Sequence, residues 1–217
     1  MIRCKNLSFS YPEGAFELNV DSFQVQSQEQ VAVVGSSGSG KTTLLYLMAG
    51  IYATNLGSVT INDIELSQYS ETDRQDFRIA SLGLVFQEFA LLEYLSVLDN
   101  VLLPYRINPV LTLSSGEKDL ALQLLSATGL IEKKDRYPHQ LSQGERQRVA
   151  VCRAMINQPQ ALLCDEPTGN LDPVNRDQVL DLLFKYSNDH QIPLVLVTHD
   201  YQILDRFSRV VNINDLV

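Results

Sequence analysis

A loop rich in glycine and serine joins an apolar segment to a helical pattern near the start of the chain. It reads Gly35-Ser-Ser-Gly-Ser-Gly-Lys-Thr42 and satisfies the spacing G-x-x-x-x-G-K-[ST]. An apolar run, residues 30–34, precedes the loop, and a helical pattern that ends at Gly50 follows it. Because glycines permit unusual dihedrals and a close approach, successive backbone N–H groups of such a loop can converge on one anion. The sequence therefore predicts a strand, a phosphate-binding loop and a helix in this order.

The side chains of this loop suit a polyphosphate that carries a divalent cation. Lys41 would supply a point charge to the β- and γ-phosphates, and the Thr42 hydroxyl would be a ligand for Mg²⁺. The predicted nucleotide-binding residues are Gly35, Ser36, Ser37, Gly38, Ser39, Gly40, Lys41, Thr42 and Thr43. The alternative, a solvated turn with a hydrated lysine, is disfavoured because the full motif rarely occurs by chance and here has its strand and helix.

The composition is that of a globular chain and argues against disulfides and a nucleic-acid partner. The chain has 217 residues, 45% of them hydrophobic and 20% charged, so it can bury a substantial core. Its formal net charge of −9 disfavours binding to a polyanion. Cys4, Cys152 and Cys164 form no C-x-x-C pair or Cys/His cluster, and their apolar neighbours predict buried, reduced thiols.

No segment has the length and hydropathy of a membrane span or an export signal. The longest apolar candidate, residues 44–51, is far shorter than the roughly 18 residues of a membrane span. The first residues, MIRCKNLSFSY, mix polar and apolar side chains where a signal peptide has an uninterrupted apolar core. We therefore expect a cytoplasmic protein that does not itself insert into the membrane.

Strand and helix patterns alternate outside the middle of the chain and predict an α/β core. The strand-like segments are residues 2–11, 15–25, 30–34, 82–86, 161–164 and 194–197, and residues 70–80 read as a capped helix. Between residues 87 and 160 strand signals vanish and helical signals multiply. We expect one domain over residues 1–217, in which residues 1–86 and 160–217 form the β-rich core and residues 87–159 form an inserted helical lobe.

Two adjacent carboxylates follow the apolar run at residues 161–164. These are Asp165 and Glu166, at the carboxyl end of a predicted buried strand, where ligands of α/β sheets bind. Asp165 is predicted to hold Mg²⁺, largely through water, and Glu166 to activate the attacking water as a general base. Alone, the pair reads equally as a strand end with solvated acids, but the phosphate loop favours the catalytic interpretation.

The segment Leu141-Ser-Gln-Gly-Glu145 precedes a long helical pattern, and Ser142 with Glu145 forms an S-x-x-E capping box. At this point the chain resembles the ATP-binding cassette (ABC) ATPases, whose signature motif is LSGGQ or a close variant ahead of the second nucleotide-binding motif. The resemblance extends over essentially the whole chain. It implies a P-loop NTPase fold, with a RecA-like core, an N-terminal antiparallel β-subdomain and an inserted α-helical subdomain, and it implies ATP with Mg²⁺ as the ligand.

Further positions match motifs of that family. The resemblance implies that Tyr11 stacks on adenine, that Gln87 of the Q-loop reaches Mg²⁺ or the attacking water, and that the switch histidine His199 contacts the γ-phosphate. It also places residues 170–172, ending in Asp172, in the D-loop. Each has a simpler alternative: Tyr11 as a packed strand end, His199 as a helix-entry residue, and Asp172 as a helix N-cap only.

The position of the signature motif, far along the chain from the phosphate loop, is explained by the assembly of the family. There, the signature binds the γ-phosphate held by the other subunit, so that two ATP molecules lie between two head-to-tail cassettes. The resemblance implies that Ser142, Gln143 and Gly144 act in this way on a second copy of the chain. Gln143 replaces the first of the two glycines of the usual motif and adds a side chain near the phosphate.

The resemblance also implies a separate transmembrane permease subunit, because the sequence itself offers no transport path. Residues 83–104 look like the branch that includes lipoprotein-release, macrolide-exporter and cell-division cassettes, which work at the cytoplasmic face of the inner membrane. Phe89, Leu91, Leu92 and Tyr94 are candidates for the groove that receives a coupling helix, with the core of the helical lobe as the alternative. A polar amino-acid importer and a non-transport cassette, such as a cell-division regulator, remain open.

Overall fold

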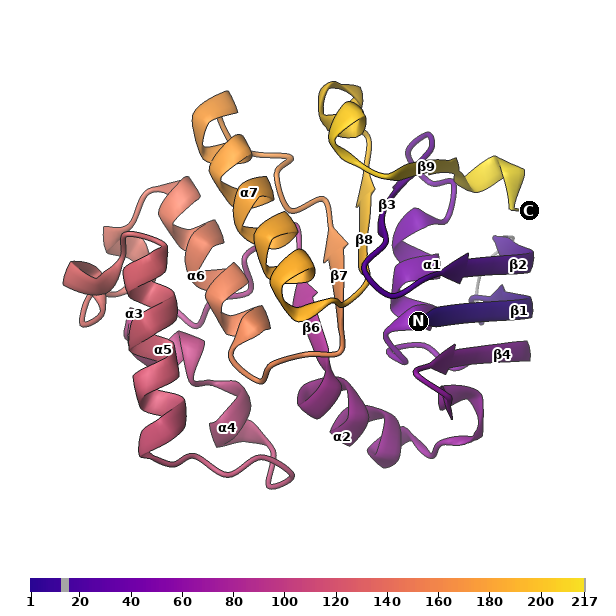
Figure 1. The fold of residues 1–217 in the computed structure, drawn as a ribbon. Coiled ribbons are helices and arrows are strands. Elements are labelled where there is room, and N and C mark those ends of the chain that lie inside the picture. Colours follow the sequence, from indigo (N-terminus) through magenta and orange to yellow (C-terminus); the bar gives the residue numbers. More distant parts are fainter. Residues whose placement is uncertain (13–15, 217) are drawn as a thin grey trace.

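The computed structural model describes residues 1–12 and 16–216 and arranges their strands in two sheets (Figure 1). One sheet is antiparallel, in the order β2-β1-β4-β5, and the other is parallel, in the order β6-β7-β8-β3-β9. The strands are β1 (Ile2–Ser10), β2 (Glu17–Val25), β3 (Gln30–Val34), β4 (Leu56–Ile61), β5 (Ile64–Glu65), β6 (Leu82–Val85), β7 (Ala161–Asp165), β8 (Leu194–Thr198) and β9 (Arg209–Asn212). This is the α/β fold that the sequence predicts, with the antiparallel sheet at the N-terminal end.

Helices cover the parallel sheet and build a lobe beside it (Figure 1). The α-helices are α1 (Lys41–Met48), α2 (Glu71–Ser81), α3 (Val97–Val101), α4 (Pro104–Ile107), α5 (Ser115–Ala127), α6 (Gln143–Met155) and α7 (Pro173–His190). Short 3₁₀ helices are η1 (Leu66–Gln68), η2 (Ile131–Lys133), η3 (Pro138–Gln140), η4 (Tyr201–Arg206) and η5 (Ile213–Asp215). No helix in the part of the chain that the structure describes has the length and apolar character to cross a membrane.

Three apolar clusters hold these elements together. The first packs α1 between the two sheets, with Leu44, Leu45 and Leu47 buried against both. The second packs α7 and part of α6 on the other face of the parallel sheet, and the third fills the helical lobe between α3, α5 and α6. Every residue of β7 and β8 is buried, as expected for strands with both faces covered. The carboxyl ends of these strands are therefore held rigidly.

The structure adds strands that the sequence did not predict. β4 reads LGSVTI, with an exposed Leu-Gly start, and its residues face Cys4 and other residues of β1 in an antiparallel ladder. β9 has only four residues and pairs with β3 alone, at the edge of the parallel sheet. Short edge segments of mixed polarity give weak periodic signals, so their strand state depends on the partner strand rather than on local sequence.

The three cysteines are buried free thiols, as the sequence predicts. Burial raises the pKa of the Cys4 thiol to about 12, and burial likewise raises that of Cys152 to about 11. Because the thiolate is the reactive form, these residues behave as small apolar side chains of the core.

Candidate functional site

The phosphate loop leads from β3 into the N-terminus of α1, as predicted. Helix α1 begins at Lys41, and its N-cap residue, Gly40, has a φ of 96° and makes no side-chain cap. A Cβ at Gly40 would lie 2.8 Å from the ring of Phe16, so both the dihedral and the packing require glycine here. Backbone N–H groups of the first turn thus remain free of a capping side chain, and with the helix dipole they favour an anion.

The Lys41 side chain is buried within this loop rather than solvated. Its Nζ donates hydrogen bonds to the carbonyl oxygens of Gly35 and Ser36, each at 2.9 Å. Among the described residues no carboxylate lies within ion-pair distance of this ammonium group. A buried cation held by neutral carbonyls at a helix N-terminus provides charge for a phosphate group.

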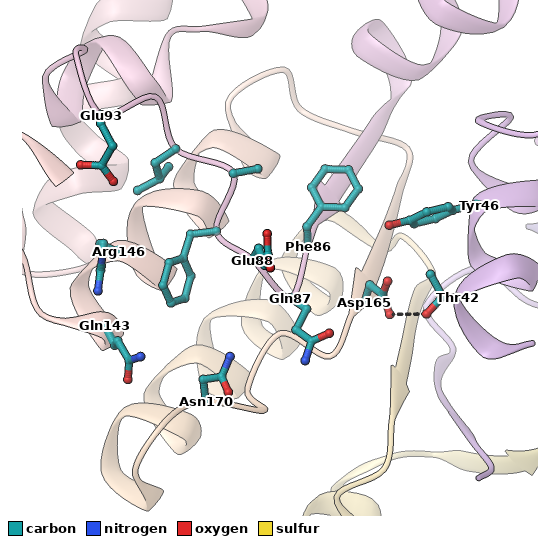
Figure 2. A pocket seen from close by; sticks show the side chains of 13 residues that line it. Thr42, Tyr46, Phe86, Gln87, Glu88, Glu93, Gln143, Arg146, Asp165 and Asn170 are labelled. Atoms are coloured by element: carbon teal, nitrogen blue, oxygen red, sulfur yellow. Dashed lines mark hydrogen bonds between the residues drawn. The ribbon is translucent and has the colours of Figure 1, made fainter. Parts of the chain in front are cut away.

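Thr42 and Asp165 bring two oxygen atoms together at the mouth of the loop. The Thr42 hydroxyl donates to Asp165 Oδ1 over 3.1 Å, shown by the dashed line in Figure 2. Burial raises the pKa of the Asp165 carboxyl, and the charge of Glu166 adds to this, while the Thr42 hydrogen bond and the charge of Lys41 oppose it. A desolvated carboxylate beside a hydroxyl is a donor set that fits Mg²⁺, which keeps several waters and needs few protein ligands.

Glu166 and His199 pair directly beside this point. His199 Nδ1 lies 2.7 Å from Glu166 Oε2, and the side chains are 62% and 16% exposed, respectively. Glu166 adopts a φ of 45°, uncommon for a residue with a side chain, while its backbone N–H donates to the Val197 carbonyl of β8. Strained backbone at a strand end is typical of functional sites, and here it fixes the direction of the carboxylate.

Gln87 and Asp165 both line a cavity of about 830 Å³. Figure 2 shows Thr42, Asp165 and Gln87 on one side of this cavity and Gln143 and Arg146 on the other. Gln87 is exposed and follows β6 after one residue, as the sequence suggests. The structure therefore brings the candidate metal ligands Thr42, Gln87 and Asp165 to one cavity.

The signature residues form the N-terminus of α6, on the side of this cavity away from the phosphate loop. Ser142 is the N-cap, and its Oγ accepts from the Glu145 backbone N–H at 3.3 Å, while the Glu145 carboxylate accepts from the Ser142 backbone N–H at 3.0 Å. The predicted capping box is confirmed. Gln143 lines the cavity together with Asn170 of the D-loop. Within one chain, then, the signature serine bonds to its own helix.

Tyr11 reaches the phosphate loop from the end of β1. Its hydroxyl forms a hydrogen bond of 2.9 Å with the Thr43 hydroxyl, and its ring packs edge-on against Phe9 and Tyr52. Together with Phe16 it walls a pocket of about 270 Å³ whose floor is formed by Gly38 and the residues that follow it. From the sequence, Phe16 is predicted only as part of the strand at residues 15–25, because no local pattern indicates that its side chain faces the phosphate loop.

Asp172 has the structural role that its sequence context predicts. It is the N-cap of α7, and its Oδ1 accepts from the backbone N–H groups of Val174 and Asn175, each at 3.1 Å. Hydrogen bonds from Asn175 hold the pKa of the Asp172 carboxyl below its usual range; the bond from the Asn175 side chain has the largest effect, and the bond from its backbone N–H follows. The D-loop thus enters α7 through a defined turn.

Comparisons with known proteins agree with this arrangement. The model of the family described as "ABC transporter" matches residues 18–169. The lipoprotein-releasing system ATP-binding protein LolD of Idiomarina loihiensis is 39% identical over 213 residues, which cover 97% of this chain and 92% of that protein. The ATP-binding cassette MJ0796, solved as a dimer bound to ADP and Pi, has 30% identity and a TM-score of 0.87, covering 98% of this chain and 94% of that one. Another dimeric structure of MJ0796, a bacterial ABC transporter cassette, matches with 31% identity and a TM-score of 0.87 over the same shares.

The family match covers most of the chain, and the fold extends the likeness to nearly all of it. The phosphate loop, the helix capped by Ser142 and the carboxylates at the carboxyl end of β7 follow one another along the chain in the order of that family's motifs. The chain therefore belongs to the ABC transporter family, as an ATP-binding subunit that hydrolyses ATP.

Proposed function

We propose that this chain powers a transporter of the lipoprotein-release type, by closing as a head-to-tail dimer around ATP. The observation that carries the dimer is the separation of the two phosphate-binding features within one chain. The phosphate loop and the signature helix line opposite sides of a cavity of about 830 Å³, and Ser142 is engaged only by its own helix among the described contacts. A second copy turned head to tail would supply the missing half of each site.

Within each site the residues have distinct roles. The loop N–H groups and Lys41 hold the β- and γ-phosphates, and Thr42 and Asp165, with Gln87 nearby, hold Mg²⁺, which supplies charge neutralisation. Glu166 takes a proton from the attacking water, and His199 orients the Glu166 carboxylate through their 2.7 Å contact. Tyr11 offers a ring face to the adenine, and Ser142, Gln143, Gly144 and the D-loop residue Asp172 approach the nucleotide of the second copy.

The buried carboxylate of Asp165 leads to a prediction about stability. Its pKa is raised, mainly by burial, so its ionised form opposes folding at neutral pH, and this cost disappears as the pH falls below the ordinary aspartate value. We expect Asp165→Asn to raise the urea midpoint of the nucleotide-free protein at pH 7, with the difference shrinking in acid. The same variant should need more Mg²⁺ for ATP binding. A lower midpoint at pH 7, measured by urea titration, would show that the ionised carboxylate stabilises the site.

A groove beside the Q-loop offers a place for the transmembrane partner. Its volume is about 420 Å³, and it lies between α2, β6, α4 and α6. Apolar Leu103, Pro104 and Ile107 line it together with longer polar side chains such as Gln75 and Arg153. Such a lining suits an amphipathic helix of a permease subunit, which would bring the chain to the cytoplasmic face of the membrane.

None of the four apolar candidates after Gln87 lines this groove, and two of them, Phe89 and Leu91, line the larger cavity instead. Leu91 packs on the core cluster of the lobe, as the alternative interpretation held. Tyr94 is exposed, and Leu92 is half-buried with both of its backbone groups bonded to the Asn100 side chain. Phe89 lines the cavity of about 830 Å³, where the Cζ atom of Arg146 lies 5.3 Å from the centroid of the Phe89 ring. The groove is therefore better tested at a residue that lines it.

Ile107→Glu places a charge in the groove at a side chain that is 64% exposed, so folding should be little affected. Because substitutions at exposed positions rarely unfold a protein, we expect the variant to fold and to hydrolyse ATP within about twofold of the native rate. It should no longer co-purify with its membrane subunit, because the new carboxylate would be desolvated in the groove. Leu56→Glu is the matched control, because Leu56 is 69% exposed on β4 in the antiparallel sheet. Retention of the membrane subunit by Ile107→Glu would exclude this groove.

Identification of the co-purified membrane subunit tests the transported class directly. A subunit that extracts lipoproteins from the membrane supports the proposal. A polar amino-acid permease or a cell-division protein would replace it, while the ATP site would stay as described.

A further inference from the structure

Gly144, the single glycine of the signature segment at residues 141–145, is held against α7 of the same chain. Gly144 lies in the first turn of α6, in ordinary helical backbone, so no unusual dihedral requires a glycine there. A Cβ at this position would lie 2.1 Å from Asn175 Oδ1, 2.3 Å from its Cγ and 2.9 Å from its Cβ. Asn175, and not the backbone of α6, therefore excludes any larger residue at position 144.

The Asn175 side chain cannot simply turn away, because hydrogen bonds fix both ends of its amide. Its Nδ2 donates to Asp172 Oδ2 at 2.6 Å, and its Oδ1 accepts from Arg148 Nη1 at 2.8 Å. Arg148 follows Gly144 by four residues and so lies on the same face of α6, one turn further on. A single amide thus joins two turns of the signature helix to the aspartate that caps α7.

We propose that Asn175 is a positioning residue, which sets the signature turn against the D-loop so that both present one surface to a second copy. The inference rests on the head-to-tail dimer proposed above. Gln143 directly precedes Gly144, and Asn170 precedes Asp172 by two residues; both line the same side of the large cavity, as Figure 2 shows. A shift of α6 relative to α7 would move the Ser142 hydroxyl and Asp172 apart, and both are candidates for contact with the partner's nucleotide.

Four proteins form the test: the Glu166→Gln chain, and the same chain with Gly144→Ala, with Asn175→Gly, or with both. Asn175→Gly removes the three atoms that would lie nearest to the new methyl group. We expect Gly144→Ala to raise the dissociation constant of the ATP-bound dimer about tenfold or more when Asn175 is present, and less than about threefold when it is absent. ATP affinity of the dilute monomer, whose phosphate loop is untouched, should not change. Sedimentation over a concentration series measures the dimer.

Urea unfolding of the same proteins without ATP provides a readout that needs no dimer. With Asn175 present, Gly144→Ala should lower the unfolding midpoint because the methyl group overpacks the contact. With Asn175→Gly, the same change should leave the midpoint unchanged or raise it, because alanine favours the helix more than glycine does. Gln178→Ala is the matched control: it removes the other Arg148 partner, at 2.9 Å, and leaves Asn175 in place, so neither readout should change.

Two results would overturn the inference. If Gly144→Ala weakens the dimer equally with and without Asn175, then the bound phosphate excludes the methyl group and Asn175 has no positioning role. If the unfolding midpoint falls equally in both backgrounds, Asn175 does not set the space at position 144. A Glu166→Gln reference that stays monomeric with ATP would instead contradict the proposed dimer, and the unfolding cycle would still decide the Asn175 contact.

Discussion

Glu166→Gln should bind ATP normally and hydrolyse it about 10²- to 10⁴-fold more slowly, the range associated with loss of a general base. The glutamine keeps the shape of the side chain and can still bond to His199, which lies 2.7 Å from the carboxylate. It cannot accept the proton of the attacking water. Single-turnover hydrolysis of ATP with Mg²⁺ measures this step. We expect residue 166 to keep its positive φ in the variant, because glutamine has the shape of glutamate.

The same variant should accumulate as an ATP-bound dimer, because the step that separates the copies is blocked. Adding Ser142→Arg should abolish that dimer, since a bulky side chain at the α6 N-cap would fill the space meant for the second copy's γ-phosphate. Glu93→Gln is the charge control: Glu93 is an exposed carboxylate that lines the same cavity, and its loss should leave turnover unchanged. Hydrolysis by Glu166→Gln at the native rate would remove Glu166 as the base.

Those parts of the fold that rest on local signals could be predicted from the sequence. The boundaries of β3 and the capping box at Ser142 follow from patterns within a few residues, and the structure reproduces them. The phosphate loop is of the same kind, because its glycines, its lysine and the flanking apolar run are contiguous. Strand β9 was missed, since four residues at a sheet edge carry too little periodicity to stand out.

Contacts between distant segments could not be predicted in this way. Glu166 and His199 meet because β7 and β8 are neighbours in the parallel sheet, an order that no local pattern specifies. Asn175 meets Gly144 because α6 packs on α7. The sequence places Asn175 near the start of a helix, but nothing in the neighbouring residues predicts that its side chain contacts Gly144. The resemblance to a family indicated which residues matter, but only the structure shows how the signature and the D-loop are joined.

Loss of the Lys41 charge should be the most damaging single change for nucleotide binding. The Lys41 ammonium is buried and bonded to two carbonyl oxygens of its own loop, so its charge is in place before a phosphate arrives. Removing one partner of a buried, hydrogen-bonded charge pair costs about 2 to 5 kcal/mol, which corresponds to an affinity loss of about 30-fold to about 5000-fold. We expect this loss in Lys41→Ala, measured by equilibrium titration with Mg-ATP.

Two further variants separate the charge of Lys41 from its packing. Lys41→Met retains most of the volume without the charge, so it should lose ATP affinity as fully as Lys41→Ala while the unfolding midpoint falls less, because less of the buried space is emptied. Lys185→Ala removes an exposed lysine that pairs with Asp189 on α7, and it should bind ATP normally. Native affinity in a folded Lys41→Met protein would mean that the loop N–H groups hold the phosphates without the ammonium. The glycine-rich loop would then act as an anion site through its backbone alone, and Lys41 would serve only to hold the loop closed through the carbonyls of Gly35 and Ser36.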